Sequence, residues 1–260
     1  PRPALLRYST QRRAGNLAAL AGHQRRHGVS TPAPLAQVDN GHVGIDEFVN
    51  GRQLRDVVCT GEAVGAELGD ALRTFHATVP PPHLPRRTAP SELDSATRGL
   101  NGLIEWAPAL AEPAVGVADL LARSLPRSTA DVLIHGDLHA KNLLVNRETI
   151  TFVDLERVSV GPAAVDLGCF RAHAIALAIR QPGVSPGALA HADEMVERYR
   201  TGGAAIDGPT IGWHTAIGLV DQALLVTIHL EGDWQSTATT LLDAARDQLE
   251  HPSTIIGFNR

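Results

Sequence analysis

The sequence predicts an α+β fold, with a short strand-containing N-terminal region followed by a mostly helical remainder. Strand candidates around one helix fill the first 50 residues, whereas apolar residues after position 60 recur mainly at helical spacing. The exception is a pair of short apolar runs at 143–145 and 150–153 with four polar residues between them, which indicates a β-hairpin. With 43% hydrophobic and 20% charged residues the chain has the composition of a globular protein, and 260 residues suffice for two lobes sharing a cleft.

The N-terminal region reads as strand, helix, strand, strand. Residues 4–9 form the first strand candidate, and 11–27 carry apolar residues at helical spacing, with Gly28 as the stop signal. Residues 35–38 and 42–49 follow as strand candidates around an Asp-Asn-Gly turn.

Helices dominate the rest of the chain. A helix ending at His76, with Thr60 as a possible cap, precedes a stretch at 79–90 whose five prolines make it a stiff, non-helical connection. The further helices that the sequence predicts span 91–106, 113–125, 162–180, 188–200, 209–230 and 234–250. The helix at 162–180 is apolar on nearly all sides and is therefore expected to be buried.

Composition excludes several classes of protein. No run approaches the length of a membrane span, and the N-terminus lacks the apolar core of a signal peptide. Cys59, Cys169 and the twelve histidines show no metal-type or disulfide spacing, so a cytoplasmic location is the default expectation. Six arginines in residues 1–38 do not indicate nucleic-acid binding, because aromatic residues make up only 4% of the chain.

The chemistry-bearing residues gather in one stretch, 132–156. Asp137 and Asn142 precede the predicted hairpin and Asp154 follows it, so a folded hairpin brings all three together. Two carboxylates and an amide oxygen suit Mg²⁺, which prefers oxygen ligands. The alternative is a plain turn and a strand end, which would require three polar groups at this spacing by accident.

The spacing is also that of the kinase pattern H-x-D-L-x-x-x-N followed by a metal-binding aspartate. With HGDLHAKN at 135–142, FVDLE at 152–156 and GPAAVDLG at 161–168, the sequence resembles the aminoglycoside phosphotransferase and choline kinase family. This family is the small-molecule branch of the protein-kinase-like fold. The resemblance implies a bilobal fold, with a small mixed nucleotide-binding lobe over 1–49 and a mainly helical lobe over 50–260 that holds the catalytic hairpin.

The resemblance also implies an activity: ATP- or GTP-dependent, Mg²⁺-assisted transfer of the γ-phosphoryl group to a hydroxyl of an amino sugar, sugar or amino alcohol. Asp137 would be the catalytic residue, and Asn142 and Asp154 would hold the metal. His135 and Asp166 would support the catalytic loop, although Asp166 could equally be a helix cap.

On the nucleotide side the sequence departs from the family pattern. Lys141 is the one lysine of the chain, so the strand lysine of kinases is missing, and Arg7 stands in its place. The helix after Arg7 contains no acidic residue, and too few residues precede Arg7 for a Gly-rich loop. We therefore expect either a small lobe that is incomplete at its N-terminus or another way of holding nucleotide. The backbone from Glu47 to Val49 would meet the adenine, and Lys141 would stabilise the transferring phosphoryl group or remain solvated.

The acceptor site is the least specified. An acidic surplus in the C-terminal helices, including Asp221, Glu231 and Asp233, would complement a cationic acceptor, although such residues are usually solvated. A catalytically impaired, kinase-like nucleotide-binding or regulatory protein is the second hypothesis. The sequence indicates no oligomeric state.

Overall fold

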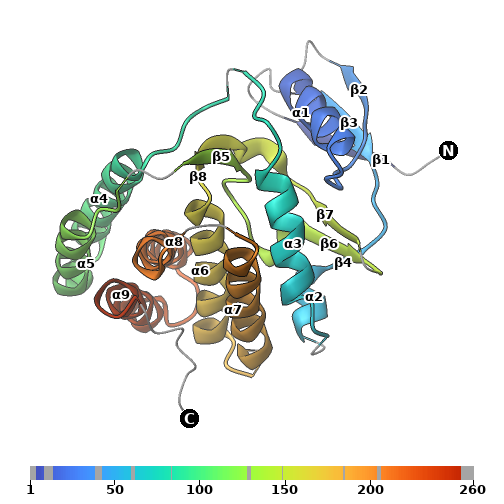
Figure 1. Ribbon diagram of the computed structural model, residues 1–260. Helices are drawn as coiled ribbons and strands as arrows, with labels where there is room; N and C mark the ends of the chain where they lie inside the picture. Colours follow the sequence, from blue (N-terminus) through green and yellow to red (C-terminus); the bar gives the residue numbers. More distant parts are fainter. Residues whose placement is uncertain are drawn as a thin grey trace.

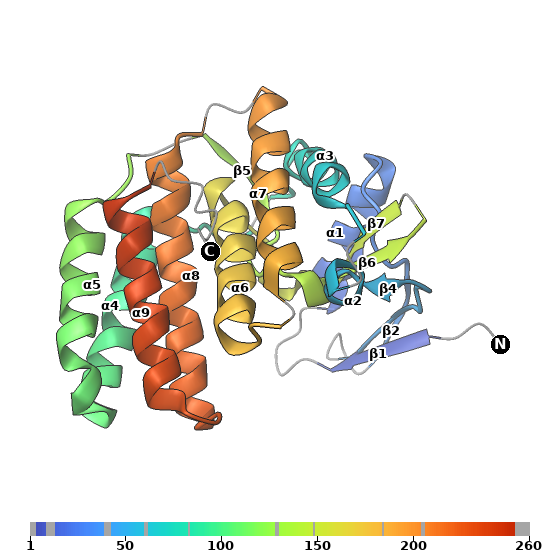
Figure 2. The same ribbon diagram turned by 90° about the horizontal axis from the view of Figure 1, so that it is seen from below.

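The computed structural model describes residues 4–8, 14–38, 43–59, 62–82, 84–127, 130–147, 149–183, 185–203 and 206–252. Two three-stranded sheets lie toward one end of the molecule and most of the long helices toward the other (Figures 1 and 2). This arrangement confirms the predicted α+β, protein-kinase-like fold.

The N-terminal sheet consists of β1 (Ala4–Tyr8), β2 (Pro34–Val38) and β3 (Val43–Glu47). All pairings are antiparallel and β3 lies in the middle, with alternate residues buried. Helix α1 (Ala14–Arg26) packs on β2 and β3, and Gly28 follows it with a φ of 82°, the left-handed conformation that ends many helices. These elements agree with the prediction.

The predicted hairpin belongs to a second sheet, formed by β4 (Arg52–Gln53), β6 (Leu143–Asn146) and β7 (Thr149–Phe152). The turn is tighter than the predicted four residues, because Asn146 pairs with Thr149. Arg147 takes a φ of 54°, as a two-residue hairpin turn requires.

A third, two-stranded sheet pairs β5 (Asp131–Ile134) with β8 (Ser159–Pro162). The sequence did not predict β4, β5 or β8, and it also missed α2 (Leu54–Cys59).

The other helices agree with the prediction within a few residues, except that α3 begins at Gly65 with Val64 as its N-cap residue, so the predicted cap at Thr60 is wrong. They are α3 (Gly65–His76), α4 (Ala89–Trp106), α5 (Ala111–Arg123), α6 (Ala164–Arg180), α7 (Ser185–Thr201), α8 (Gly208–His229) and α9 (Trp234–Glu250). By length and composition α8 could cross a membrane, contrary to the expectation that no run is long enough. Of its most apolar window, however, 72% is buried inside the protein, where α8 packs on α4, α6 and α9.

Helix α6 is buried along most of its length, as its apolar sequence predicted. Leu167 and Phe170 belong to a core shared with α3, α7 and the hairpin, whereas Ala172 and Ile175 belong to a core shared with α4, α5, α8 and α9. The start of α6 therefore lies beneath the catalytic loop, between the two cores.

Candidate active site

The loop between β5 and the hairpin carries the predicted catalytic motif, and α6 holds it from below. Gly136 has a φ of 78°, and a side chain there would collide with the carbonyl oxygen of Arg157. Asp166, fully buried in the first turn of α6, accepts hydrogen bonds from the backbone N–H of His135 at 2.7 Å and of Gly136 at 2.8 Å. Each of the two carboxylate oxygens of Asp166 thus accepts a hydrogen bond from the loop.

Asp166 is also hydrogen-bonded to His76, whose Nε2 lies 3.0 Å from Asp166 Oδ2 and whose Nδ1 lies 2.8 Å from the Tyr199 hydroxyl. Burial alone would raise the pKa of the Asp166 carboxyl, but the hydrogen bond and charge of His76 outweigh it, so the pKa is lowered. The residue before α6 makes no side-chain cap and Asp166 bonds elsewhere. Its geometry is that of a loop support rather than of a helix cap.

His135 ties the loop to the far end of the hairpin. Its Nε2 donates to the carbonyl oxygen of Val153 at 2.9 Å, and its ring lies near Phe75 and Phe152. The N–H of Val153 in turn donates to the carbonyl oxygen of Asn142 at 3.0 Å. These contacts bring the two ends of the hairpin together, as the sequence predicted.

Asp137, Asn142 and Asp154 consequently lie around one loop. Asn142 Nδ2 donates to the backbone oxygen of Asp137 at 3.0 Å, which leaves its Oδ1 as the oxygen available to a cation. Asp154 is exposed and left-handed, with a φ of 58°, and its side chain caps no helix. An amide oxygen and an exposed carboxylate are the hard ligands that Mg²⁺ accepts, so these residues fit that ion.

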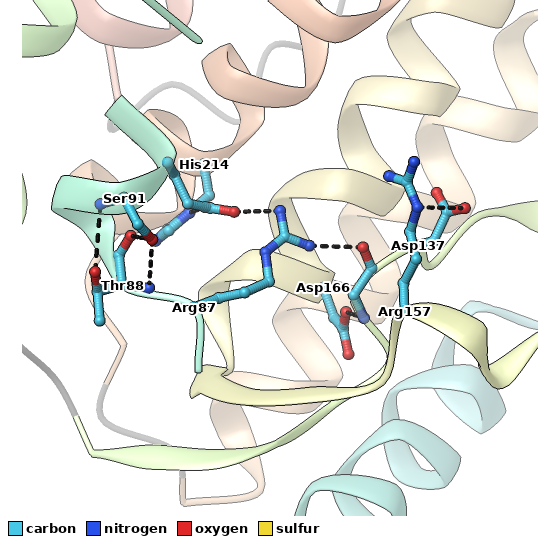
Figure 3. A network of polar contacts seen from close by, with 9 residues as sticks. Arg87, Thr88, Ser91, Asp137, Arg157, Asp166 and His214 are labelled. Atoms are coloured by element: carbon cyan, nitrogen blue, oxygen red, sulfur yellow. Dashed lines mark hydrogen bonds and ion pairs between the residues drawn. The ribbon is translucent and has the colours of Figure 1, made fainter. Parts of the chain in front are cut away.

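The Asp137 side chain opens on a cavity of about 510 Å³, a usual size for a small-molecule site. The catalytic loop, α4, α6 and α8 enclose this cavity, which we call the acceptor cavity. Its polar lining consists of Arg87, Glu92, Ser95, Asp137, His139, Arg157, Cys169, His173, His214, Asp221 and Gln222. Arg157 Nε lies 3.9 Å from Asp137 Oδ2 (Figure 3).

Of the predicted acceptor residues, the structure brings only Asp221 to this cavity. The Asp221 carboxylate is open to the cavity, but the surrounding protein displaces much of its water, and Glu92 adds negative charge. Together they raise the pKa of Asp221 to about 6. Glu231 instead pairs with Arg180 on a neighbouring cavity, and Asp233 accepts from Ser236 N–H as the cap of α9. Asp233 lines neither cavity, so its position does not support an acceptor role.

Two of the predicted nucleotide residues, Arg7 and Glu47, lie on the paired strands β1 and β3. Arg7 is in β1 opposite Gly44, and the structure describes its backbone only. The Glu47 side chain accepts a hydrogen bond from the Ala33 N–H at 3.2 Å, and the Glu47 N–H donates to the Ala33 oxygen. The side chain and the N–H of Glu47 thus both bind the backbone of the N-terminal region. Val49 lies in the connection to β4.

Lys141 is exposed and lines a second cavity of about 320 Å³ together with Arg55 and Arg180. His139 and His173 line both cavities, and their rings stack with centroids 4.5 Å apart. Burial lowers the pKa of both, that of His173 to about 4. The two histidines are therefore neutral at pH 7.

The sequence did not predict a partly buried chain of polar contacts that joins the wall of the acceptor cavity to the predicted catalytic loop. His214 Nδ1 lies 2.9 Å from Glu92 Oε2, Glu92 Oε1 is paired with Arg87, and Arg87 donates to the carbonyl oxygen of Gly136 at 2.7 Å. Figure 3 shows Arg87 lying between His214 and the loop above Asp166. No sequence signal marks this chain, because its members come from three separate parts of the fold.

The charge on Glu92 is held by its partners. Burial alone would raise the pKa of the Glu92 carboxyl, but the hydrogen bond from His214 and the charge of Arg87 lower it overall. Arg87 and Glu92 thus form a partly buried ion pair beside the predicted catalytic loop.

The fold and the loop constellation define a kinase-like phosphotransferase. A family model described as the phosphotransferase enzyme family matches residues 2–201, and the chain belongs to this family. No curated protein is significantly similar to the sequence.

Several solved structures share the fold. A choline/ethanolamine kinase family protein from Mesorhizobium loti is 21% identical, with a TM-score of 0.65 over 96% of this chain and 83% of that one. A thermostable mutant of aminoglycoside phosphotransferase APH(4)-Ia is 14% identical, with a TM-score of 0.70 over 95% and 87%. A glucosamine kinase is 16% identical, with a TM-score of 0.70 over 96% and 76%.

Proposed function

We propose that this chain transfers the γ-phosphoryl group of ATP or GTP to a hydroxyl of a small molecule, with Mg²⁺. The observation that carries the proposal is the placement of Asp137, whose carboxylate faces the acceptor cavity from a loop held at both ends by Asp166 and the hairpin. Family membership supports a phosphotransferase, and similar APH(4)-Ia structures were determined with ADP or AMP-PNP and hygromycin B.

In this scheme Asp137 accepts or orients the proton of the attacking hydroxyl, and its supports hold it in position. Phosphoryl transfer depends mainly on positioning and electrostatics, so a rigid loop is the main requirement on the acceptor side. Asn142 and Asp154 would hold Mg²⁺, which when bound neutralises phosphate charge.

For the acceptor we propose an amino sugar or amino alcohol. Asp221 and Asp137 line the same cavity and would attract a cationic group, with a neutral sugar as the competing class. Affinity for a cationic acceptor should fall as salt is added, whereas salt-independent binding of a neutral sugar would exclude this choice.

Turnover of Mg-ATP over a panel of aminoglycosides, amino sugars, choline-like amines and sugars tests the proposal. Asp137→Asn should lower kcat by about 10²–10⁴-fold at unchanged nucleotide affinity, because the substitution removes the proton acceptor but keeps the shape of the side chain. Asp243→Asn on the exposed face of α9 is the matched control and should leave kcat unchanged. Nucleotide binding without turnover on any acceptor would instead indicate the regulatory, catalytically impaired alternative.

A further inference from the structure

We propose that the acceptor cavity contains a second metal site, in which Asp137, Cys169 and His173 bind a thiophilic divalent cation such as Zn²⁺. One ligand atom from each residue lies within 4.8 Å of the other two, so small side-chain adjustments bring all three to one ion. Cys169 and His173 escape notice in the sequence because a single Cys-x-x-x-His pair matches no common metal motif.

Helix α6 builds both sides of this site. Cys169 and His173 are four residues apart and therefore lie on the same helix face. Asp166, three residues before Cys169, binds the backbone of the loop that carries Asp137. The same helix thus supplies two ligands and fixes the position of the third.

The donor set selects the kind of ion. A thiolate, an imidazole nitrogen and one carboxylate oxygen suit Zn²⁺ at tetrahedral geometry, whereas Mg²⁺ requires six oxygen ligands. Three protein ligands leave the fourth position to water. Zinc binding releases the Cys169 thiol proton to solvent, and the Asp221 carboxylate on the same cavity adds to the attraction for a cation.

Arg157 is the one cation near Asp137 that competes for its carboxylate among the contacts that the structure describes. The Arg157–Asp137 distance is 3.9 Å, and the Arg157 side chain is 68% exposed. A contact this long and this solvated is weak, so Arg157 can move into solvent when an ion binds.

The consequence for activity rests on the proposed function. An ion held by Asp137 takes away the proton acceptor and occupies the cavity, so zinc should inhibit in competition with the acceptor and not with the nucleotide. The magnesium residues Asn142 and Asp154 lie outside this ligand set.

Cobalt titration of the 260-residue protein in the presence of excess Mg²⁺ tests the site independently of activity. Co²⁺ should produce a thiolate-to-cobalt charge-transfer band that stoichiometric Zn²⁺ abolishes. Cys169→Ser should remove the band, and His173→Ala should weaken Co²⁺ affinity on the order of 100-fold, since it removes one of three ligands. Cys59→Ser, at the other cysteine, is the control and should keep both the band and the affinity.

The absence of a thiolate band in the wild type, or its persistence in Cys169→Ser, would overturn the metal site. Zinc inhibition is then measured for each variant relative to its own zinc-free rate, and Cys169→Ser should shift the inhibitory concentration by the same factor as the cobalt affinity. A cobalt band with no turnover on any acceptor would refute the proposed function but leave the metal site standing. Turnover without the cobalt band would refute the metal site and leave the proposed function standing.

Discussion

At the scale of single residues, Asp221 shows how the acceptor cavity changes a carboxylate. The surrounding protein and the charge of Glu92 raise the pKa of Asp221 to about 6. Asp221 therefore loses its negative charge when the pH falls only slightly below neutral. Burial lowers the pKa of the neighbouring His173 to about 4, so this side chain is neutral at higher pH. The charge of Asp221 therefore changes with pH between about 5 and 7.

Binding of a cationic acceptor should accordingly weaken as the pH falls through about 6. A bound cation favours ionised Asp221, so protonation must be reversed before binding, and Kd should rise by up to about tenfold per pH unit below 6. Isothermal titration from pH 5 to 8 would measure this effect. Asp221→Asn should flatten the profile and raise Kd at pH 7.

The raised pKa of Asp221 has the opposite effect on folding: ionised Asp221 favours binding of a cation but lowers the stability of the folded state. A carboxyl group whose pKa is higher in the folded than in the unfolded state favours folding at low pH and costs stability once it ionises, as the pH rises from about 4 to above 6. Asp221→Asn should therefore increase the free energy of unfolding at pH 7 by about 1 kcal/mol, a value reduced from the full shift because the carboxylate is open to solvent. Denaturant melts at pH 7 that show equal or lower stability, together with a pH-independent Kd, would contradict this account of Asp221.

At the scale of elements, the start of α4 is attached to the catalytic loop. The N–H of Arg87 donates to the Val160 oxygen of β8 at 2.8 Å, and its side chain reaches the Gly136 oxygen. The next residue, Thr88, caps α4 through a reciprocal pair of hydrogen bonds with Ser91. The Arg87 side chain thus binds the loop, whereas the Thr88 side chain caps the helix.

Arg87→Lys should therefore lower kcat by about tenfold and leave nucleotide affinity unchanged. A lysine retains the charge opposite Glu92 but lacks the planar fork that reaches Glu92 and Gly136 together, so the loop loses one of its supports. Thr88→Ala is the control: it should lower the free energy of unfolding by about 1 kcal/mol and leave kcat unchanged. Equal effects of the two variants on kcat would show that Arg87 affects activity only through the stability of the fold.

The contact between α6 and α8 depends on a glycine. A Cβ added at Gly168 would lie 2.6 Å from the Cβ of His214, which is closer than such atoms approach. Gly168→Ala should thus separate the helices and lower the free energy of unfolding by about 1–3 kcal/mol. At Gly102, inside α4, an added Cβ meets nothing within 4 Å, so Gly102→Ala should instead stabilise by about 0.5–1 kcal/mol. Thermal unfolding of the two variants gives the comparison, and destabilisation by both would show that the loss at Gly168 is not a matter of packing.

At the scale of the whole molecule, the sequence predicted what is local. Asp137, Asn142 and Asp154 lie within 18 residues of one another, and a single hairpin brings them together, so spacing alone placed them. Long helices were predicted for the same reason, because each has its own apolar repeat.

What the sequence could not predict depends on contacts distant in the chain. His214 meets Glu92 across 122 positions only because α4 packs on α8. Strands β5 and β8 have four residues each, and the whole hairpin separates them in the sequence. Four residues are too short a pattern to identify as a strand when the pairing partner is unknown. The metal cluster of the acceptor cavity combines a loop and a helix in the same way.

The combined site also makes a prediction about the stability of the whole chain. A ligand that binds only the folded state stabilises it by about 2.7 kcal/mol at a concentration of 100 Kd, which for a chain of this size raises Tm by roughly 5–10 °C. We expect ATP with Mg²⁺ to produce such a shift, and ATP with EDTA to produce a much smaller one. Asp154→Ala should abolish the difference between the two conditions because the exposed Asp154 carboxylate is a proposed metal ligand, whereas Asp137→Asn should preserve it because that residue acts on the acceptor side. Differential scanning fluorimetry of the three proteins decides the matter: a Mg²⁺-dependent shift that survives in Asp154→Ala would place the nucleotide-bound metal away from the hairpin.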